Sequence, residues 1–241
     1  MSRLSTSHDL LQSRLSISTA DFPQTQTADW GSSIPGISRV IRKLGVSEFR
    51  RRLFHMTPAL LPAVLPFLDH PDPWGMLLMG AVATIAVVVI VLSIVLAPYI
   101  KRNGETDWRY AVWGYMIPVI APILLFPDRA EWGLMTLQIL ALGDGSATLG
   151  GLMFGGRRLP WNPRKTVAGL ICFTMMGAMG ATLSFWAEAL PGVPFGIAFA
   201  ICGTASLCAG LVESLPIRSN DNFRVGMSAL LSGIFMTMLL T

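Results

Sequence analysis

The sequence is poor in charged side chains. Asp, Glu, Lys and Arg make up 13% of its 241 residues, whereas a soluble globular domain carries about 25%. This deficit excludes an ordinary soluble domain, and several apolar runs of span length indicate a polytopic membrane protein. Cysteine is also scarce: Cys172, Cys202 and Cys208 lie in apolar runs without CxxC spacing. We interpret them as small buried hydrophobic side chains.

Several catalytic motifs are missing as well. The chain has no GxxxxGK[ST] loop, no GxGxxG, no HExxH and no GxSxG, so P-loop enzymes, Rossmann dinucleotide sites, zincin proteases and hydrolases with a nucleophile elbow are all excluded. Phosphoryl chemistry in this chain would therefore need a Mg²⁺ site embedded in the membrane.

Apolar runs are what the sequence has in abundance. We expect an all-α polytopic membrane protein of about seven transmembrane helices, because helices satisfy their backbone hydrogen bonds in lipid and no barrel alternation is visible. The expected spans are 53–68, 74–98, 110–126, 132–154, 167–190, 195–212 and 225–240. The first contains Pro58, Pro62 and Pro66 and is therefore expected to be kinked or re-entrant.

The region before these spans is expected to have two parts. Residues 1–39 are rich in Ser, Thr and Gln and are predicted to be a disordered cytoplasmic tail. Residues 40–52 interleave basic and apolar side chains, which favours an amphipathic segment on an anionic membrane surface. Residues 53–241 are then the transmembrane catalytic domain.

The basic residues predict the topology. With the N-terminus in the cytoplasm, all but one of the 18 Lys and Arg residues fall on the cytoplasmic side, and Arg129 is the exception. This follows the positive-inside rule and predicts a multi-pass protein with its C-terminus on the opposite side. It also accounts for the basic excess without nucleic-acid binding.

One acid stands inside the fourth apolar run. Asp144 lies between Gly143 and Gly145, and Gly150 follows. We expect these glycines to break the helix and create a half-helix N-terminus near Ser146 that binds phosphate. An acid at membrane depth is a functional hypothesis by default, and this one suits Mg²⁺. The alternative is a structural Asp that caps the half-helix.

A basic loop follows that run. Arg157, Arg158, Arg164 and Lys165 precede the fifth span, with Thr166 directly after the lysine. Lysine and arginine both bind phosphate. For Arg157 and Arg158 the simpler interpretation is a positive-inside anchor.

A second acidic group closes the sixth span. Glu213 lies near the cytoplasmic end of its helix, where a negative charge opposes the helix dipole, and Asp221 and Asn222 follow. A bound cation would explain this placement; ordinary interfacial acids are the alternative. The predicted topology puts these residues on the same face as Lys165, with Asp144 within reach.

A third group stands where the first span begins. Arg51, Arg52 and His55 lie in the stretch RRLFH. A histidine at an interface is usually structural or solvated, but it can also act as a base or contact a phosphate.

These stretches resemble a known family. GDGSATLGGLMFGG, NPRKTVAG and AGLVESLPIRSNDN, preceded by RRLFH, are similar to segments of the dolichol kinase, phytol kinase and CTP-dependent diacylglycerol kinase family, which is distantly related to the phosphatidate cytidylyltransferases. The resemblance covers roughly residues 55–226. After Asp221 the chain lacks the DR-x-DS type of signature of the cytidylyltransferases, which favours a kinase.

The resemblance implies a membrane-embedded kinase. Its co-substrate would be CTP, or ATP, as the Mg²⁺ complex, and its acceptor a polyprenol, a phytol-like alcohol or diacylglycerol. The expected site residues are as follows: catalytic Asp144, Lys165 and His55; nucleotide- and phosphate-binding Gly143, Gly145, Gly150, Arg164, Lys165, Thr166 and Asn222; and metal-binding Asp144, Glu213 and Asp221. A CDP-lipid synthase and a non-enzymatic transporter or scaffold are the alternatives, and a homodimer is left open.

Overall fold

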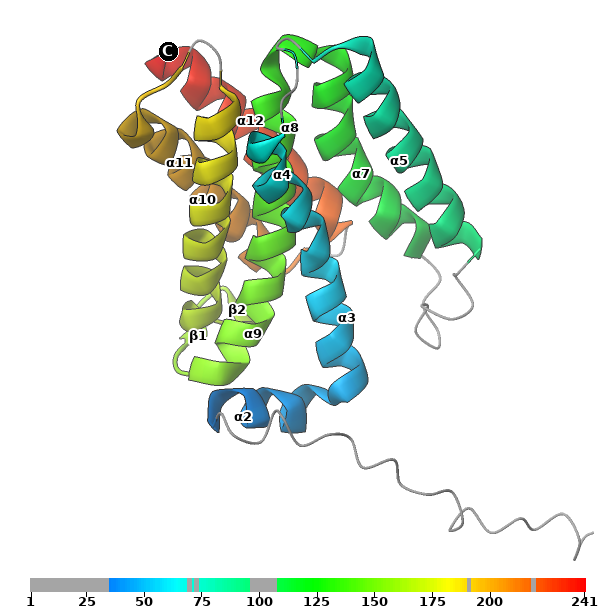
Figure 1. The fold of residues 1–241 in the computed structure, drawn as a ribbon. Coiled ribbons are helices and arrows are strands. Elements are labelled where there is room, and N and C mark those ends of the chain that lie inside the picture. Colours follow the sequence, from blue (N-terminus) through cyan, green and yellow to red (C-terminus); the bar gives the residue numbers. More distant parts are fainter. Residues whose placement is uncertain (1–34, 69–70, 72–73, 96–107, 190–191, 218–219) are drawn as a thin grey trace, which may run out of the picture.

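The computed structural model describes residues 35–68, 71, 74–95, 108–189, 192–217 and 220–241. This part of the chain is mostly helical, and its long helices stand side by side in a bundle (Figure 1). The predicted tail falls mainly outside these residues. Its last five residues, 35–39, are not disordered, because they open the helix α2, Pro35–Leu44.

The centre of the bundle is built from roughly the C-terminal half of the chain. α8, Ala130–Gln138, continues through a π-helical turn, Ile139–Gly143, into α9, Asp144–Phe154. α10, Val167–Glu188, contacts both halves of this long helix, and α11, Phe195–Ser214, and α12, Asp221–Leu240, follow in turn. The shared core contains fully buried side chains from α8, the π-helical turn, α10, α11 and α12, including Met135, Ile139, Phe173, Phe185, Ile201, Ala205 and Ala229.

Two further apolar helices flank this core. α7, Trp108–Leu125, packs against α8 and α12, and α5, Met76–Val95, packs against α7 on the outside (Figure 1). Pro118 and Pro122 lie inside α7. Pro118 is buried beside Gly226 of α12, where a Cβ would come within 2.5 Å of the proline ring. The absence of a side chain at Gly226 therefore allows the two helices to approach closely.

The described structure contains four helical segments long and apolar enough to cross a membrane, which makes it a membrane protein by length and composition. They are Pro127–Phe154, Val167–Glu188, Phe195–Ser214 and Asp221–Leu240. Two shorter apolar stretches, Met76–Leu92 and Val112–Leu125, fall where the second and third spans are expected. The expected total of seven spans therefore stays a prediction.

The first expected span has a different form from the others. α3, Val46–Met56, is followed by a 3₁₀ turn, Thr57–Ala59, the short helix α4, Leu60–Val64, and a second 3₁₀ turn, Leu65–Phe67. A proline lies in each of the three pieces after α3. These prolines divide the segment, because a proline removes a backbone donor and clashes with the preceding turn. The kink predicted from these prolines is present.

The fourth helix is not interrupted at Asp144. The expected break is replaced by the π-helical turn, and the backbone of Asp144 is helical, with φ −62° and ψ −42°. Ser146 lies inside the continuous helix, where its hydroxyl donates to the carbonyl of Gly143 at 2.9 Å. The half-helix N-terminus predicted near Ser146 is therefore absent, because a π-helical turn accommodates an extra residue without ending the helix.

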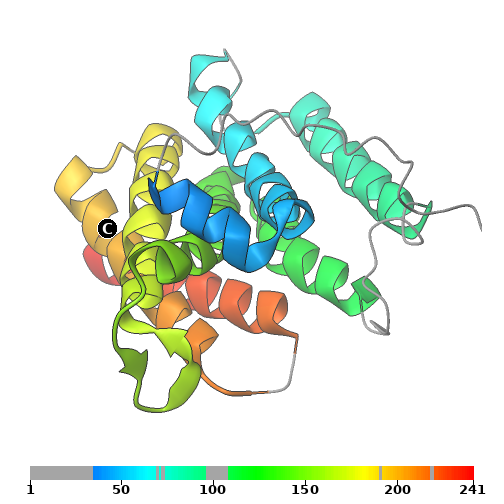
Figure 2. The same cartoon turned by 90° about the horizontal axis from the view of Figure 1, so that it is seen from below.

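A small hairpin corrects the all-α expectation. β1, Arg158–Leu159, pairs antiparallel with β2, Asn162–Thr166. Gly155 and Gly156, with φ of +64° and +92°, turn the chain out of α9 toward the hairpin, a conformation that glycine adopts without a steric cost. The hairpin and α2 lie at one end of the bundle, and the C-terminus lies at the other (Figures 1 and 2).

The basic segment 40–52 forms two helices rather than one. Gly45, with φ +80°, separates α2 from α3. α2 packs on α9, with Val40 buried and Arg42 and Lys43 exposed. Seen from below, it runs across the end of the bundle (Figure 2). The predicted amphipathic character is thus present, and part of the apolar face covers protein.

Candidate active site

Asp144 is the centre of a charged cluster between the N-terminal helices and the bundle. It is the first residue of α9, directly after the π-helical turn, and its side chain is 26% exposed. Arg52 of α3 donates from Nη1 to Oδ2 of Asp144 at 3.0 Å. His55 Nε2, one turn further along α3, lies 3.6 Å from the same oxygen. Residues three apart on a helix share a face, so α3 presents both side chains to the acid.

The His55 ring is enclosed. It packs edge-on against Tyr115 of α7 with ring centroids 5.3 Å apart, and its Nε2 is buried without a hydrogen-bond partner in the described structure. A histidine ring with an unpartnered nitrogen can accept a proton.

Lys165 and Glu213 form the second ion pair of the cluster. Lys165 lies near the end of β2 with its side chain 39% exposed, and Glu213 lies in the last turn of α11 with its side chain 8% exposed. The cation offsets the unfavourable position of an acid at a helix C-terminus. The ammonium of Lys165 thus accounts for the placement of Glu213, and the metal-binding role of Glu213 stays a prediction.

The hairpin is fixed on α11 and α10 by hydrogen bonds. Asn162 Nδ2 donates to the carbonyl of Ser214 at 2.9 Å, and Trp161 Nε1 donates to Ser214 Oγ at 2.9 Å. Thr166 caps α10, with Oγ1 accepting from the Gly169 amide at 3.1 Å. Lys165 therefore stands on a strand that is tied down on both sides.

The two ion pairs are neighbours. The Asp144 carboxylate is close enough to act electrostatically on Glu213, and Asp221 does so as well. The cluster thus alternates in charge, with Arg52 on Asp144 and Lys165 on Glu213. This juxtaposition matches the expectation that Asp144, Lys165 and Glu213 share one end of the molecule.

The predicted glycines have packing roles. A Cβ at Gly143 would come within 2.9 Å of the Phe173 ring, and one at Gly150 within 2.3 Å of the Cys172 sulfur. A Cβ at Gly145 would reach Met56 at 2.4 Å. Close helix contact explains these three glycines, and their part in nucleotide binding stays a prediction.

The remaining predicted residues lie around the cluster. Arg164 is exposed on the hairpin, and the Thr166 side chain is engaged in capping α10. Asp221 and Asn222 are in the first turn of α12. Asp221 is 67% exposed and pairs with Arg224 at 2.9 Å. Asp221 is thus near the cluster, but its carboxylate is paired with an arginine of the same helix.

The carboxylates do not form a protein-only metal cage. Within the described ranges, no three His, Cys, Asp or Glu side chains gather closely enough to hold a metal ion. Mg²⁺, however, commonly takes one or two carboxylates and completes its shell with waters and substrate phosphates. Asp144 and Glu213 lie within electrostatic range of each other, and their role as magnesium ligands stays a prediction.

Sequence reasoning missed two features of the cluster. Tyr115, whose buried hydroxyl has no hydrogen-bond partner in the described part of the chain, faces His55 and lies within electrostatic range of Asp144. A polar ring in the otherwise apolar run 110–126 was the available signal. Asn162, buried and bonded to Ser214, was also overlooked, although it lies in the basic loop three residues before Lys165.

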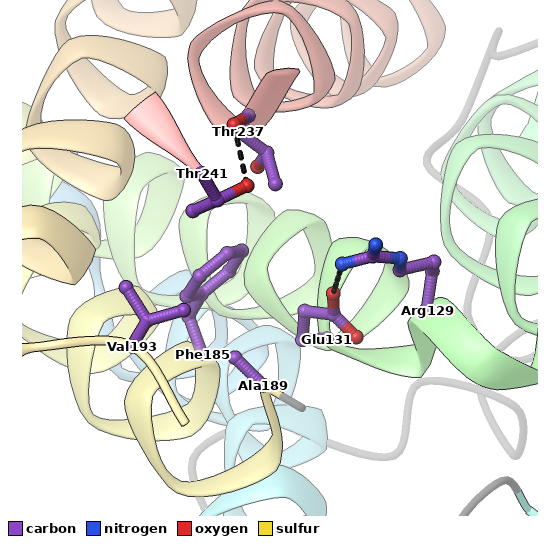
Figure 3. Close-up of a pocket in the computed structure, with 7 residues that line it drawn as sticks. All are labelled: Arg129, Glu131, Phe185, Ala189, Val193, Thr237 and Thr241. Atoms are coloured by element: carbon purple, nitrogen blue, oxygen red, sulfur yellow. Dashed lines mark hydrogen bonds and ion pairs between the residues drawn. The ribbon is translucent and has the colours of Figure 1, made fainter. Parts of the chain in front are cut away.

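A small cavity lies at the other end of the bundle. It has a volume of about 140 Å³ and is lined by Arg129, Glu131, Phe185, Ala189, Val193, Thr237 and Thr241 (Figure 3). Arg129 and the buried Glu131 approach each other at 3.7 Å, and Thr241 donates to the carbonyl of Thr237 at 2.7 Å. None of the predicted site residues lines it, so the charged cluster is the better candidate.

The fold and the cluster define a helical membrane protein with an ionisable site at one end of its bundle. No protein-family model and no solved structure matches the chain. Over 135 residues it is 28% identical to probable phytol kinase 1, chloroplastic, of Glycine max, a match that covers 50% of this chain and 42% of the relative. Over 123 residues it is 28% identical to phytol kinase 1, chloroplastic, of Arabidopsis thaliana, covering 49% of this chain and 40% of the relative.

A farnesol kinase is also similar. The chloroplastic enzyme of Arabidopsis thaliana is 25% identical over 126 residues, covering 51% of this chain and 41% of the relative. The chain thus spans less than half the length of these relatives. These relatives are named as phytol and farnesol kinases, and none of the three is named for dolichol, diacylglycerol or CTP.

Proposed function

We propose that this protein is a membrane-embedded lipid-alcohol kinase that phosphorylates a phytol-like or related isoprenoid alcohol. The observation that carries the proposal is the Asp144 carboxylate, held by Arg52 beside His55 and next to the Lys165–Glu213 pair, at one end of an apolar bundle. The similarity to phytol and farnesol kinases supports the reaction class. Diacylglycerol is the less favoured acceptor.

The reaction is transfer of the terminal phosphoryl group of a nucleotide. The alcohol oxygen forms a bond to the terminal phosphorus, and the bond from that phosphorus to the bridging oxygen of the nucleoside diphosphate breaks. The hydroxyl proton leaves to Asp144 or to the neutral His55. The products are a lipid monophosphate and a nucleoside diphosphate, and the protein contributes mainly positioning and charge neutralisation.

The protein's cations would receive the phosphates. Lys165 stands on the fixed hairpin with its ammonium partly exposed, and the exposed Arg164 precedes it. A lysine binds phosphate as a point charge, and an arginine binds it bidentately. Lys165 would exchange part of its contact with Glu213 for the nucleotide. Thr166 and Asn222 are the neighbouring polar groups of this end of the molecule.

A magnesium ion fits this site only together with nucleotide. Asp144 and Glu213 would hold it, and it would supply positive charge to the transferring phosphoryl group. We place the nucleotide at the hairpin end of the bundle, the cytoplasmic face by the distribution of basic residues. CTP is the expected nucleotide and ATP the alternative.

Labelled nucleotides test the proposal. The purified protein in nanodiscs is given Mg²⁺, phytol or farnesol, and CTP or ATP labelled at the α or the γ position. Label from the γ position is expected in the lipid, with nucleoside diphosphate as co-product. In a parallel assay a lipid phosphate replaces the alcohol, and label from the α position with release of pyrophosphate would then identify a CDP-lipid synthase. Absence of γ label from both alcohols would overturn the kinase proposal.

One substitution links this activity to the cluster. Asp144→Asn removes the charge and is expected to lower the rate about 100-fold or more, since a proton-transfer or metal-binding group is lost. Asp128→Asn, at the other end of the bundle and exposed, is the matched control and should leave the rate unchanged. Equal activity of the two variants would exclude Asp144 from the site.

A further inference from the structure

A large apolar groove runs along the outside of the bundle beside the charged cluster. Its volume is about 770 Å³, within the roughly 300–1,000 Å³ typical of ligand sites. One wall is the proline-rich segment from Leu53 to Phe67, and the other is the part of α10 from Gly180 to Ala187. Gln138 and Leu142, from α8 and the π-helical turn, line it between the walls.

The walls are tied together by a single buried side chain. Gln138 Nε2 donates to the carbonyl of Ala59 at 3.1 Å and to Ser184 Oγ at 3.0 Å. These bonds connect α8 to both walls, so the groove is part of the folded structure. Gly180 deepens it, since a Cβ there would come within 2.4 Å of Leu142 and 3.1 Å of Gln138 Oε1.

One end of the groove adjoins the candidate active site. Leu53 and Met56 line the groove, whereas Arg52 and His55, on the same helix, contact Asp144. Met56 also packs against Gly145, next to the acid. One face of α3 therefore lines the groove, and another face presents Arg52 and His55 to Asp144.

The other end of the groove points away from the cluster. It continues past Leu183 to Trp186 and Ala187, near the end of α10, and past Pro66 to Phe67. At about 1.5 Å of rise per residue, the wall from Leu53 to Phe67 is roughly 20 Å long. The groove is thus elongated, with one charged and one apolar end.

From this continuity we infer that the groove binds the hydrocarbon chain of a single-chain alcohol, with its hydroxyl at the Asp144 end and its tail toward Ala187. The inference rests on the proposed function and names the part of the protein that selects the acceptor. A single elongated groove suits one extended chain. A hydroxyl is small and neutral, so it can approach Asp144 and His55 without bringing a second charge into the cluster.

Two substitutions should shorten the groove. Ala63→Phe and Ala187→Phe each add a ring at an exposed alanine of its lining, so neither overpacks the core. We expect Ala187→Phe, at the distal end, to lower kcat/KM at least tenfold for phytol and much less for the shorter farnesol. The KM for nucleotide should not change. Ala200→Phe, an exposed alanine of α11 outside the groove, is the control and should behave as the unmodified protein.

A binding measurement separates this inference from the proposed function. The unmodified protein in nanodiscs is labelled with a photoactivatable analogue of phytol, and the labelled residues are mapped by mass spectrometry. Labelling within 180–187 and 57–67, displaced by phytol but not by an alkane of the same length, is expected. Equal displacement by the alkane or by phospholipid would mean that ordinary bilayer lipid fills the groove, and would overturn the inference.

The outcomes of the two experiments distinguish the groove assignment from the kinase proposal. If the protein phosphorylates phytol but Ala63→Phe and Ala187→Phe keep the chain-length preference, the groove assignment is wrong and the kinase stands. If no alcohol is phosphorylated but phytol competes for labelling in the groove, the binding site stands and the kinase proposal is wrong. If a phenylalanine variant does not fold, the photolabelling result alone decides.

Discussion

The carboxylate of Asp144 accepts a hydrogen bond from Arg52 Nη1 at 3.0 Å across 92 positions of sequence. The pair joins two helices. Arg52 belongs to α3, a basic helix that precedes the bundle, and Asp144 is the first residue of α9. A charge-assisted hydrogen bond between partly buried partners is stronger than a neutral one. Arg52 thus neutralises the acid and holds α3, with His55, against α9.

Removal of the Arg52 guanidinium should damage the site. Arg52→Gln is expected to lower the rate of phosphoryl transfer about 10- to 100-fold, because a hydrogen bond to a charged group contributes about 1.5–3 kcal/mol. Arg50→Gln, on the same helix with an exposed side chain, is the matched control. The measurement is kcat/KM for the alcohol. Similar rates for the two variants would contradict a role for Arg52.

The Lys165–Glu213 pair should show coupling in stability. Lys165→Met leaves the buried Glu213 carboxylate without its cation, whereas Lys165→Met combined with Glu213→Gln removes both charges. We therefore expect the double variant to be more stable than the single lysine variant, with a coupling free energy of about 0.5–3 kcal/mol. Thermal unfolding in detergent measures it. If the two substitutions change the free energy of unfolding additively, the ion pair contributes nothing to stability.

Gly150 tests whether the glycines serve packing or ligand binding. Gly150→Ala places a Cβ 2.3 Å from the Cys172 sulfur and is expected to destabilise the protein by about 1–3 kcal/mol. Gly203→Ala, in α11 with nothing within 4 Å of the added carbon, should be neutral or stabilising by up to about 1 kcal/mol. The measurement is the free energy of unfolding without nucleotide. A stable Gly150→Ala variant that has lost nucleotide affinity would favour ligand binding instead.

Nucleotide should stabilise the protein only together with magnesium. At roughly 100 times the Kd, the ligand adds about 2.7 kcal/mol of stability, which raises the Tm by about 5–10 °C for a protein of this size. Asp144→Asn should lose the magnesium-dependent part, and Asp128→Asn should keep it. Thermal unfolding with CTP, ATP and EDTA measures both effects. A shift of equal size in EDTA would argue against a metal at Asp144.

Part of the architecture could be predicted from local sequence patterns. The expected spans 167–190 and 195–212 agree closely with α10, Val167–Glu188, and α11, Phe195–Ser214. Long apolar runs bounded by charged or turn-forming residues mark such helices, because each must satisfy its own backbone in lipid. The prolines at 58, 62 and 66 likewise predicted the kink in the first segment.

Other features depended on contacts between distant residues. The glycines around Asp144 suggested a broken helix, but Phe173, Met56 and Cys172 pack against them, and the helix continues through a π-helical turn. Short motifs do not specify such side-chain partners. The pair of Asp221 with Arg224, in contrast, is local to one helix, and the metal role of Asp221 stays a prediction.

The sequence by itself determined that this protein is an apolar helical bundle with a few ionisable residues near its helix ends. It also indicated Asp144, Lys165 and Glu213 as candidate site residues. Asp144 and Glu213 stand out because a charge is costly in an apolar run or at an unfavourable helix end. Only the tertiary structure decided that Arg52 holds Asp144 beside His55, that Lys165 holds Glu213, and that an apolar groove begins beside them. These relationships arise where separate helices pack together, and no local pattern encodes the choice of partner.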